Sequence, residues 1–203
     1  MGPVLQSYVC GFNTEYCPAP NFIVHNVCAL VKVRMVISMA GKYLNLDSID
    51  DNWQATDKAT LLFVLQDDNV LLIRKKRGLG AGKINGPGGK LEPGETPRQC
   101  AMREVREELC ISVLDAQACG ELRFQFTDGY SIHVYVFTST RFEGEPTETD
   151  EADPLWFKRS DIPYAEMWAD DRIWLPRVLD GASVNGKFIF SKDILIGHEV
   201  HFD

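Results

Sequence analysis

Two pairs of short apolar runs in the middle of the chain predict β-hairpins. Turn residues separate the members of each pair, Asp67-Asp68-Asn69 in the first and Asp128-Gly129 in the second. Runs of this length, rich in β-branched and aromatic residues and divided by turn residues, are typical of paired strands. The runs are residues 60–66 (TLLFVLQ) and 70–76 (VLLIRKK), then residues 120–126 (GELRFQF) and 130–140 (YSIHVYVFTST). Shorter runs predict three more strands, at residues 155–158, 187–191 and 193–200.

Two segments have the features of helices. Thr96 followed by Pro97 predicts a helix start, because threonine caps the free N–H groups and proline needs none at the first position. This helix should continue to about Leu109. Residues 170–181 (DDRIWLPRVLDG) also follow a helical pattern, with Gly181 as the stop. Strands mixed with two helices predict an α/β fold.

The chain before about Thr56 shows no clear periodicity. One interpretation is an extra strand and linker packed on the domain, and another is that the natural start lies downstream, at Met35 or Met39. We therefore divide the chain into an N-terminal extension of unknown role, residues 1–56, and a domain, residues 57–203.

Composition excludes several classes of protein. A net charge of −8 argues against binding to a nucleic acid duplex, whose phosphates need clustered Lys and Arg. The apolar stretch from Phe22 to Met39 is interrupted by His25, Asn26, Lys32 and Arg34, so no membrane span is expected. The six cysteines contain no C-x-x-C pair and follow no secretory leader, which makes a reducing cytoplasm the simpler location.

The first predicted helix gathers negative charge on one face. Glu104, Glu107 and Glu108 lie three or four residues apart, so all three side chains project from the same face. Taken alone, this is most often a solvated helix, and Arg103 could relieve the repulsion by pairing with Glu107 at i, i+4. A glycine-rich loop, residues 77–90, precedes it.

The helix and loop together fit a longer pattern, G-x5-E-x7-R-E-U-x-E-E-x-G-U, where U is aliphatic. It is the signature of the Nudix hydrolases, which this segment resembles. One position departs: Cys110 stands where the pattern has glycine. The resemblance implies a Nudix-type α/β/α sandwich with a mixed β-sheet. The matching residues are Gly89, Glu95, Arg103, Glu104, Val105, Glu107, Glu108 and Ile111.

The resemblance also implies a metal site of oxygen ligands that suits Mg²⁺, with Mn²⁺ as an alternative. The implied ligands are Glu104, Glu107, Glu108 and the carbonyl of Gly88. Glu95 and Arg103 would join the loop to the helix by a salt bridge. Either Glu107 or Glu108 would deprotonate the attacking water.

From about Thr60 to Ile196 the chain resembles the MutT-related 8-oxo-dGTP diphosphatases, in particular the animal oxidised purine nucleoside triphosphate hydrolases. Three segments carry the likeness: residues 75–96, 146–157 and 162–176. The likeness adds Glu151 as an acidic metal ligand. The substrate-binding residues that it implies are Thr60, Lys75, Asn85, Gly88, Gly89, Lys90, Trp168, Asp170 and Asp171.

Most of these residues also have plain structural interpretations. Asn85 could be a turn residue and Trp168 part of the core. Asp170 and Asp171 could cap a helix, and Lys75 could end a solvated strand. Animal relatives carry aromatic residues where this chain has Leu79, Ile84 and Pro87, which predicts a less aromatic pocket wall.

As a set, these side chains suit a purine. Trp168 offers a broad face, Asn85 supplies a donor and an acceptor, and two neighbouring carboxylates can share one proton. We expect a monomer that hydrolyses 8-oxo-dGTP or a related oxidised purine triphosphate to the monophosphate and pyrophosphate. Two alternatives stay open: the same chemistry on another nucleotide, and a Nudix module that binds nucleotides without hydrolysing them.

Overall fold

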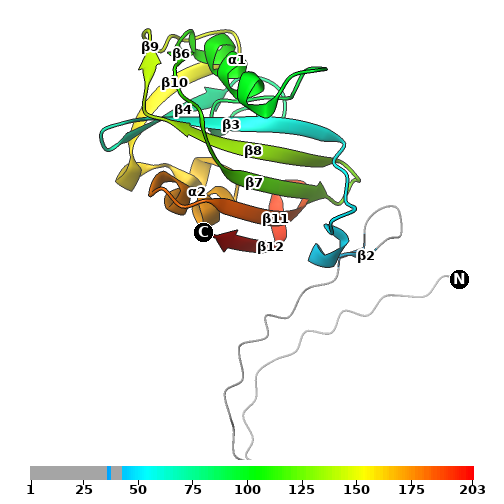
Figure 1. Ribbon diagram of the computed structural model, residues 1–203. Coiled ribbons are helices and arrows are strands. Elements are labelled where there is room, and N and C mark those ends of the chain that lie inside the picture. The colour runs from blue at the N-terminus through cyan, green and yellow to red at the C-terminus, as the bar shows by residue number, and fades with distance from the viewer. Residues whose placement is uncertain (1–35, 38–42) are drawn as a thin grey trace, which may run out of the picture. The chain divides into compact units, whose positions relative to one another are not determined.

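The computed structural model describes residues 36–37 and 43–203. This part of the chain contains one large sheet, two α-helices and a few short elements (Figure 1). The helices are α1 (Pro97–Leu109) and α2 (Asp171–Leu179), and the short 3-10 helices are Leu46–Ser48, Arg159–Asp161 and Tyr164–Glu166. The strands are β1 (Val36–Ile37), β2 (Tyr43–Leu44), β3 (Asp57–Gln66), β4 (Asn69–Lys75), β5 (Ile84–Asn85), β6 (Ser112–Val113), β7 (Gln117–Phe126), β8 (Ser131–Ser139), β9 (Phe142–Glu143), β10 (Ala152–Lys158), β11 (Val184–Ser191) and β12 (Ile194–Phe202).

The large sheet has eight strands in the order β10-β4-β3-β8-β7-β11-β12, with β5 beside β4. It is mixed, because β3 runs parallel to β8 and β7 runs parallel to β11, while the other pairs are antiparallel. Both predicted hairpins are confirmed as β3–β4 and β7–β8. The three shorter runs fall in β10, β11 and β12, which extend beyond the predicted bounds.

The two helices cover opposite faces of the sheet (Figure 1). Ala101, Val105 and Leu109 of α1 pack on one face with side chains of β3 and β4. On the other face, Trp174, Leu175 and other apolar residues of α2 pack with the alternate side chains of the same strands. This arrangement confirms the predicted α/β/α sandwich.

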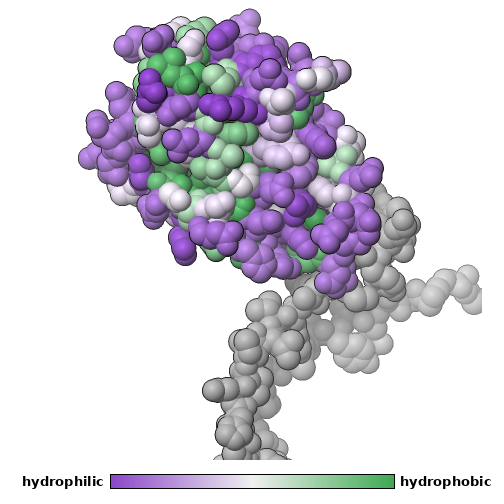
Figure 2. Space-filling model, in the orientation of Figure 1, coloured by the Kyte–Doolittle hydropathy of each residue, from purple (hydrophilic) through white to green (hydrophobic). Residues whose placement is uncertain are grey.

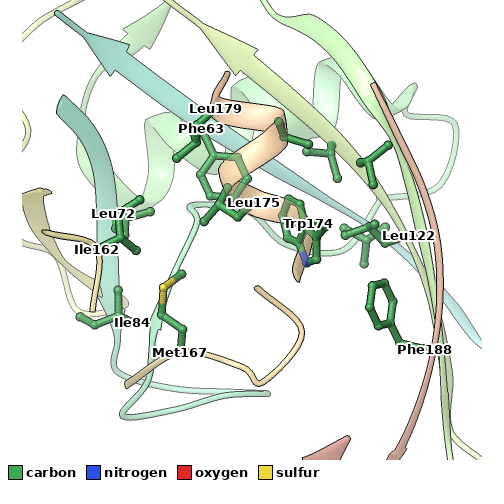
Figure 3. Close-up of a cluster of buried hydrophobic side chains, with 14 of the residues drawn as sticks. Phe63, Leu72, Ile84, Leu122, Ile162, Met167, Trp174, Leu175, Leu179 and Phe188 are labelled. Carbon is green, nitrogen blue, oxygen red and sulfur yellow. The ribbon is translucent and has the colours of Figure 1, made fainter. Parts of the chain in front are cut away.

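The cluster under α2 holds the largest buried side chain, Trp174, beside Phe63 and Phe188 (Figure 3). Phe63 and Trp174 meet edge to face, with ring centroids 5.9 Å apart. Burying side chains of this size stabilises the fold by about 2–3 kcal/mol each. The outer surface is mostly polar on the face shown in Figure 2.

Both helix ends follow the sequence signals. Thr96 caps α1: its hydroxyl accepts from the N–H of Gln99 at 3.3 Å, and its own N–H donates to the Gln99 side chain at 3.0 Å. Cys110 ends α1 in the left-handed conformation, with φ 59° and ψ 21°. Gly181 follows α2 with φ 98°. Cys110 therefore adopts a backbone conformation that favours glycine.

The described residues just before β3 pack on the domain. Ile49 is fully buried, and the indole N–H of Trp53 donates to Gln125 at 3.0 Å. Residues 1–35 and 38–42, which hold Met35, Met39 and most of the apolar stretch from Phe22, lie outside the described residues. The division at residue 57 and the choice of start site stay predictions. In the part of the chain with a described structure, neither helix has the length and apolar character of a membrane span.

Candidate active site

A cavity of about 460 Å³ is lined by residues of both helices, of the sheet and of the glycine-rich loop. All nine residues predicted to bind substrate line it, and so do Glu104 and Glu151. We call one part of the cavity the α1 end; it is formed by α1, the loop before α1 and the edge where β4 meets β10. We call the other part the α2 end; it is formed by Asn85 and residues 168–174. The fold thus brings eleven of the predicted site residues to one cavity, whereas Glu95, Arg103, Glu107 and Glu108 do not line it.

The glycine loop is held beside β3 by backbone hydrogen bonds. The N–H groups of Thr60 and Leu62 donate to the carbonyls of Gly89 and Pro87, both at 2.9 Å. A β-carbon at Gly88 would lie 2.0 Å from the Thr60 carbonyl oxygen, and one at Gly89 would lie 2.4 Å from the Glu104 carboxylate. Only glycine allows the loop to approach the strand and the helix this closely.

Arg103 connects the loop to the acidic face of α1. Its guanidinium lies 2.9 Å from a carboxylate oxygen of each of three glutamates, Glu95, Glu104 and Glu107. It also donates to the Lys90 carbonyl at 3.2 Å. The predicted salt bridge between Glu95 and Arg103 is therefore present, and Arg103 lowers the pKa of Glu95 to about 2. The predicted i, i+4 pair with Glu107 is present as well.

Glu108, four residues after Glu104 in α1, is almost completely buried. One carboxylate oxygen lies 3.1 Å from Lys75 Nζ, and the other accepts from the N–H of Gly88 at 2.8 Å. Burial raises the pKa of both Glu108 and Glu104, although their basic neighbours oppose the shift. Lys75 is therefore not a solvated strand end, because its side chain is only 17% exposed.

Other predicted residues of this end are also paired. Glu151 forms an ion pair with Arg77. Lys90 lies 2.7 Å from Asp57, which also accepts from the Tyr130 hydroxyl at 2.9 Å. The buried Thr60 hydroxyl contacts the Cys100 thiol at 3.4 Å.

No three acidic, histidine or cysteine side chains within residues 36–37 and 43–203 are gathered as a ready metal site. The predicted ligands Glu104, Glu107, Glu108 and Glu151 instead face basic side chains. The donor set nevertheless fits a hard divalent cation, because every predicted ligand is an oxygen. Two of the carboxylates are buried at a cost in free energy that a cation would offset.

At the α2 end, Asp170 and Asp171 are buried side by side, 2% and 3% exposed. Asp170 accepts from the indole N–H of Trp174 at 2.8 Å, and Asp171 accepts from the backbone N–H of Trp168 at 3.0 Å. Asp170 and Asp171 occupy the predicted N-cap and first-turn positions of α2, but the side chain of Asp170 makes no capping bond there. Its carboxylate turns to the indole because α2 packs Trp174 beside it.

Both aspartates bind a proton more tightly than usual. Burial raises the pKa of Asp170 to about 6. Burial, followed by the nearby charge of Asp170, raises the pKa of Asp171 well above its ordinary value. Two neighbouring buried carboxyl groups disfavour double ionisation, so one can keep a proton and donate a hydrogen bond while the other accepts.

Trp168 and Asn85 complete the α2 end. The ammonium of Lys83 lies 5.0 Å from the centre of the Trp168 ring, and Phe126 and Phe190 meet the ring edge to face. Trp168 is half-buried: it packs against the core under α2 and also lines the cavity. The side-chain carbonyl of Asn85 accepts from the N–H of Gly86 at 3.0 Å, as a turn residue's would, and the residue also lines the cavity.

The sheet supplies aromatic side chains to the cavity that were not predicted from the sequence. Phe124, Phe126 and Phe190 line it together with Tyr130 and Trp174. Phe124 and Phe126 alternate with polar residues, a signal that they share one face of β7. Positions 79, 84 and 87 are not aromatic, but the cavity wall is aromatic on the sheet side.

Comparison with known proteins agrees with this geometry. Residues 55–178 match the family described as NUDIX domain. The chain is 42% identical to the oxidized purine nucleoside triphosphate hydrolase of Danio rerio and 39% identical to that of Mus musculus. Each match spans 143 residues, 70% of this chain and 92% of the relative. The crystal structure of a MutT protein from Bacillus halodurans superposes with a TM-score of 0.63 at 27% identity, covering 71% of this chain and 97% of that one. The chain belongs to the Nudix family of hydrolases.

Proposed function

We propose that the protein hydrolyses oxidised purine nucleoside triphosphates such as 8-oxo-dGTP, with Mg²⁺, to the monophosphate and pyrophosphate. The observation that carries this proposal is the pair of buried aspartates, Asp170 and Asp171, beside Trp168 and Asn85 in an aromatic cavity. The names of the two animal relatives point to the same substrates.

The α2 end would bind the base. Trp168 provides a flat apolar face for stacking, and the aspartate pair and Asn85 provide donors and acceptors for a base edge. Oxidation of a purine changes which of its atoms donate and which accept. A site whose carboxyl groups exchange one proton can match more than one such pattern.

The α1 end would bind the triphosphate and activate water. Glu104, Glu107, Glu108, Glu151 and the Gly88 carbonyl would hold Mg²⁺, with Mn²⁺ as the alternative. When bound, the cation would neutralise phosphate charge and lower the pKa of a water molecule.

The chain's own residues position the reaction and move the proton. Arg103 orients Glu104 and Glu107, and Lys75 holds Glu108. Either Glu107 or Glu108 accepts the proton of the water that attacks the β-phosphorus. The bond from that phosphorus to the oxygen shared with the α-phosphate breaks, and the monophosphate and pyrophosphate leave.

The test is kcat/KM measured over a nucleotide panel, with and without Mg²⁺. The panel contains 8-oxo-dGTP, 2-hydroxy-dATP, dGTP, dATP and a dinucleoside polyphosphate. We expect Mg²⁺-dependent turnover that favours the oxidised purines by about tenfold or more, because unpaired polar groups in a base pocket penalise the wrong base. Preference for an unmodified or dinucleoside substrate would favour the same chemistry on another nucleotide. Binding without hydrolysis would identify a binding module.

Variants of the aspartate pair test base recognition separately. Asp170→Asn and Asp171→Asn should change the ratio of kcat/KM values between purines by about tenfold, while the Mg²⁺ dependence stays as in the wild type. Asp180→Asn, on an exposed residue at the end of α2, is the matched control. An equal loss on all substrates would contradict the assigned role.

A further inference from the structure

We propose that Arg77 exchanges partners during catalysis: it neutralises Glu151 in the metal-free protein and binds the substrate's phosphates once a divalent cation takes the carboxylate. The phosphate half of this inference rests on the proposed function. The metal half does not, because it concerns only the protein and the cation.

The sheet brings these two residues together. Strands β4 and β10 are antiparallel with Lys75 opposite Ala152, and the N–H of Lys76 donates to the Glu151 carbonyl at 2.8 Å. Arg77 therefore leaves the end of β4 where Glu151 enters β10. Both residues line the cavity, and a guanidinium nitrogen of Arg77 donates to the Glu151 carboxylate.

Each predicted acidic ligand has a basic partner, but the partners are held very differently. Arg103 binds three glutamates and a backbone carbonyl and is 22% exposed, and Lys75 is 17% exposed. The side chain of Arg77 is 64% exposed, and within the described residues it forms an ion pair with Glu151. Arg77 can move without breaking a buried network, so it is the cation that an incoming metal would displace most easily.

A displaced Arg77 would remain at the cavity wall, next to the metal ligands. Its planar guanidinium can bind a phosphate through two parallel hydrogen bonds. The triphosphate brings about four negative charges to this end, more than one divalent cation neutralises. The same side chain should therefore oppose binding of the metal alone and favour binding of the nucleotide.

The test exploits these opposite signs. In Arg77→Gln, titration calorimetry with Mn²⁺ alone should show about two- to fivefold tighter metal binding, because an exposed ion pair no longer competes. Binding of α,β-imido-dGTP with Mg²⁺ should weaken by about tenfold or more, because charged hydrogen bonds to phosphate are lost. Arg77→Lys should show smaller changes in both affinities than Arg77→Gln. Lysine keeps the positive charge but lacks the planar guanidinium that can form two parallel hydrogen bonds to a phosphate.

Lys76→Gln is the matched control. It removes the same charge from the neighbouring residue, whose ammonium pairs with Glu148 and contacts the Thr149 carbonyl at 2.6 Å. Lys76 does not line the cavity. If Lys76→Gln changed both affinities as much as Arg77→Gln, the effect would be one of overall charge, and the proposal would fail.

A double substitution tests the pairing itself. Glu151→Gln should abolish the gain in Mn²⁺ affinity that Arg77→Gln produces. Unchanged Mn²⁺ affinity in Arg77→Gln overturns the exchange. If Arg77→Gln binds α,β-imido-dGTP as tightly as the wild type, and the wild type hydrolyses oxidised purine triphosphates, the exchange is overturned and the proposed function is not. A wild type that binds no nucleotide overturns the proposed function, and the Mn²⁺ titration still reports on the ion pair.

Discussion

The two ends of the cavity hold negative charge in different ways. At the α1 end, each predicted ligand carboxylate faces a lysine or an arginine. At the α2 end, Asp170 and Asp171 lie together, and their partners are an indole N–H and a backbone N–H. The first arrangement sets basic partners against the rise in pKa that burial causes in Glu104 and Glu108. The second favours protonation, which turns carboxyl groups into hydrogen-bond donors and acceptors for a neutral base.

The α1 end should be the more sensitive to the loss of one carboxylate. Either Glu107 or Glu108 accepts the proton of water, and replacing that one glutamate by glutamine should lower kcat by about 10²–10⁴-fold. Replacing the other glutamate should mainly weaken metal binding. At saturating Mg²⁺, steady-state kinetics should therefore show a lowered kcat for the first variant and a nearly normal kcat for the second. Glu143→Gln, on an exposed glutamate of β9, should have wild-type activity. Full activity of both variants would contradict the assignment of this helix face.

One residue from each end, Asp170 and Glu95, should affect stability with opposite pH dependence. Burial raises the pKa of Asp170 to about 6, so the folded protein holds a proton that the unfolded chain releases near pH 4. The free energy of unfolding should therefore fall as pH rises from about 4 to about 6, by up to about 3 kcal/mol from this residue. Asp170→Asn should remove that part of the slope in urea unfolding measured across this range.

Glu95 at the α1 end has the opposite sign. Arg103 lowers the pKa of Glu95 to about 2, so its stabilisation is present above the ordinary glutamate pKa and is lost as pH falls toward 2. Glu95→Gln should therefore flatten the acid side of the stability curve. If both substitutions changed the slope in the same direction, the difference between the two ends would not hold.

The smallest expected effect concerns the ends of the two helices. Cys110 after α1 and Gly181 after α2 both have positive φ, 59° and 98°. Cys110→Gly should stabilise the protein by about 1 kcal/mol, and Gly181→Ala should destabilise it by a similar amount. Thermal unfolding measures both changes. Activity should stay unchanged in Cys110→Gly, since Cys110 is exposed and does not line the cavity.

Local features of the fold could be predicted from the sequence. Helix α1 begins and ends at the predicted residues because Thr96, Pro97 and the position of Cys110 act within one turn of the backbone. The β3–β4 and β7–β8 hairpins were predictable for the same reason, since turn residues connect strands that are neighbours in sequence.

Features that depend on pairing between distant strands could not be predicted. The ion pair between Arg77 and Glu151 follows from the register of β4 against β10, which no local pattern specifies. Phe190 reaches the cavity because β11 runs parallel to β7, a pairing between segments about sixty residues apart. The α2-end residues were identified only through the family resemblance, because the bare pattern of Asp170 and Asp171 before a helix equally suggests a cap.

The short segment from Asn85 to Gly88 connects the two ends of the cavity, and both of these residues line it. Asn85 belongs to β5, which pairs with β4, and the carbonyls of Pro87 and Gly89 accept hydrogen bonds from β3. The three peptide units from Asn85 to Gly88 span at most about 10 Å. Side-chain replacements in the α2 end can alter which base is accepted while leaving this span intact. Insertion or deletion of one residue in the segment should instead change the distance between the two ends.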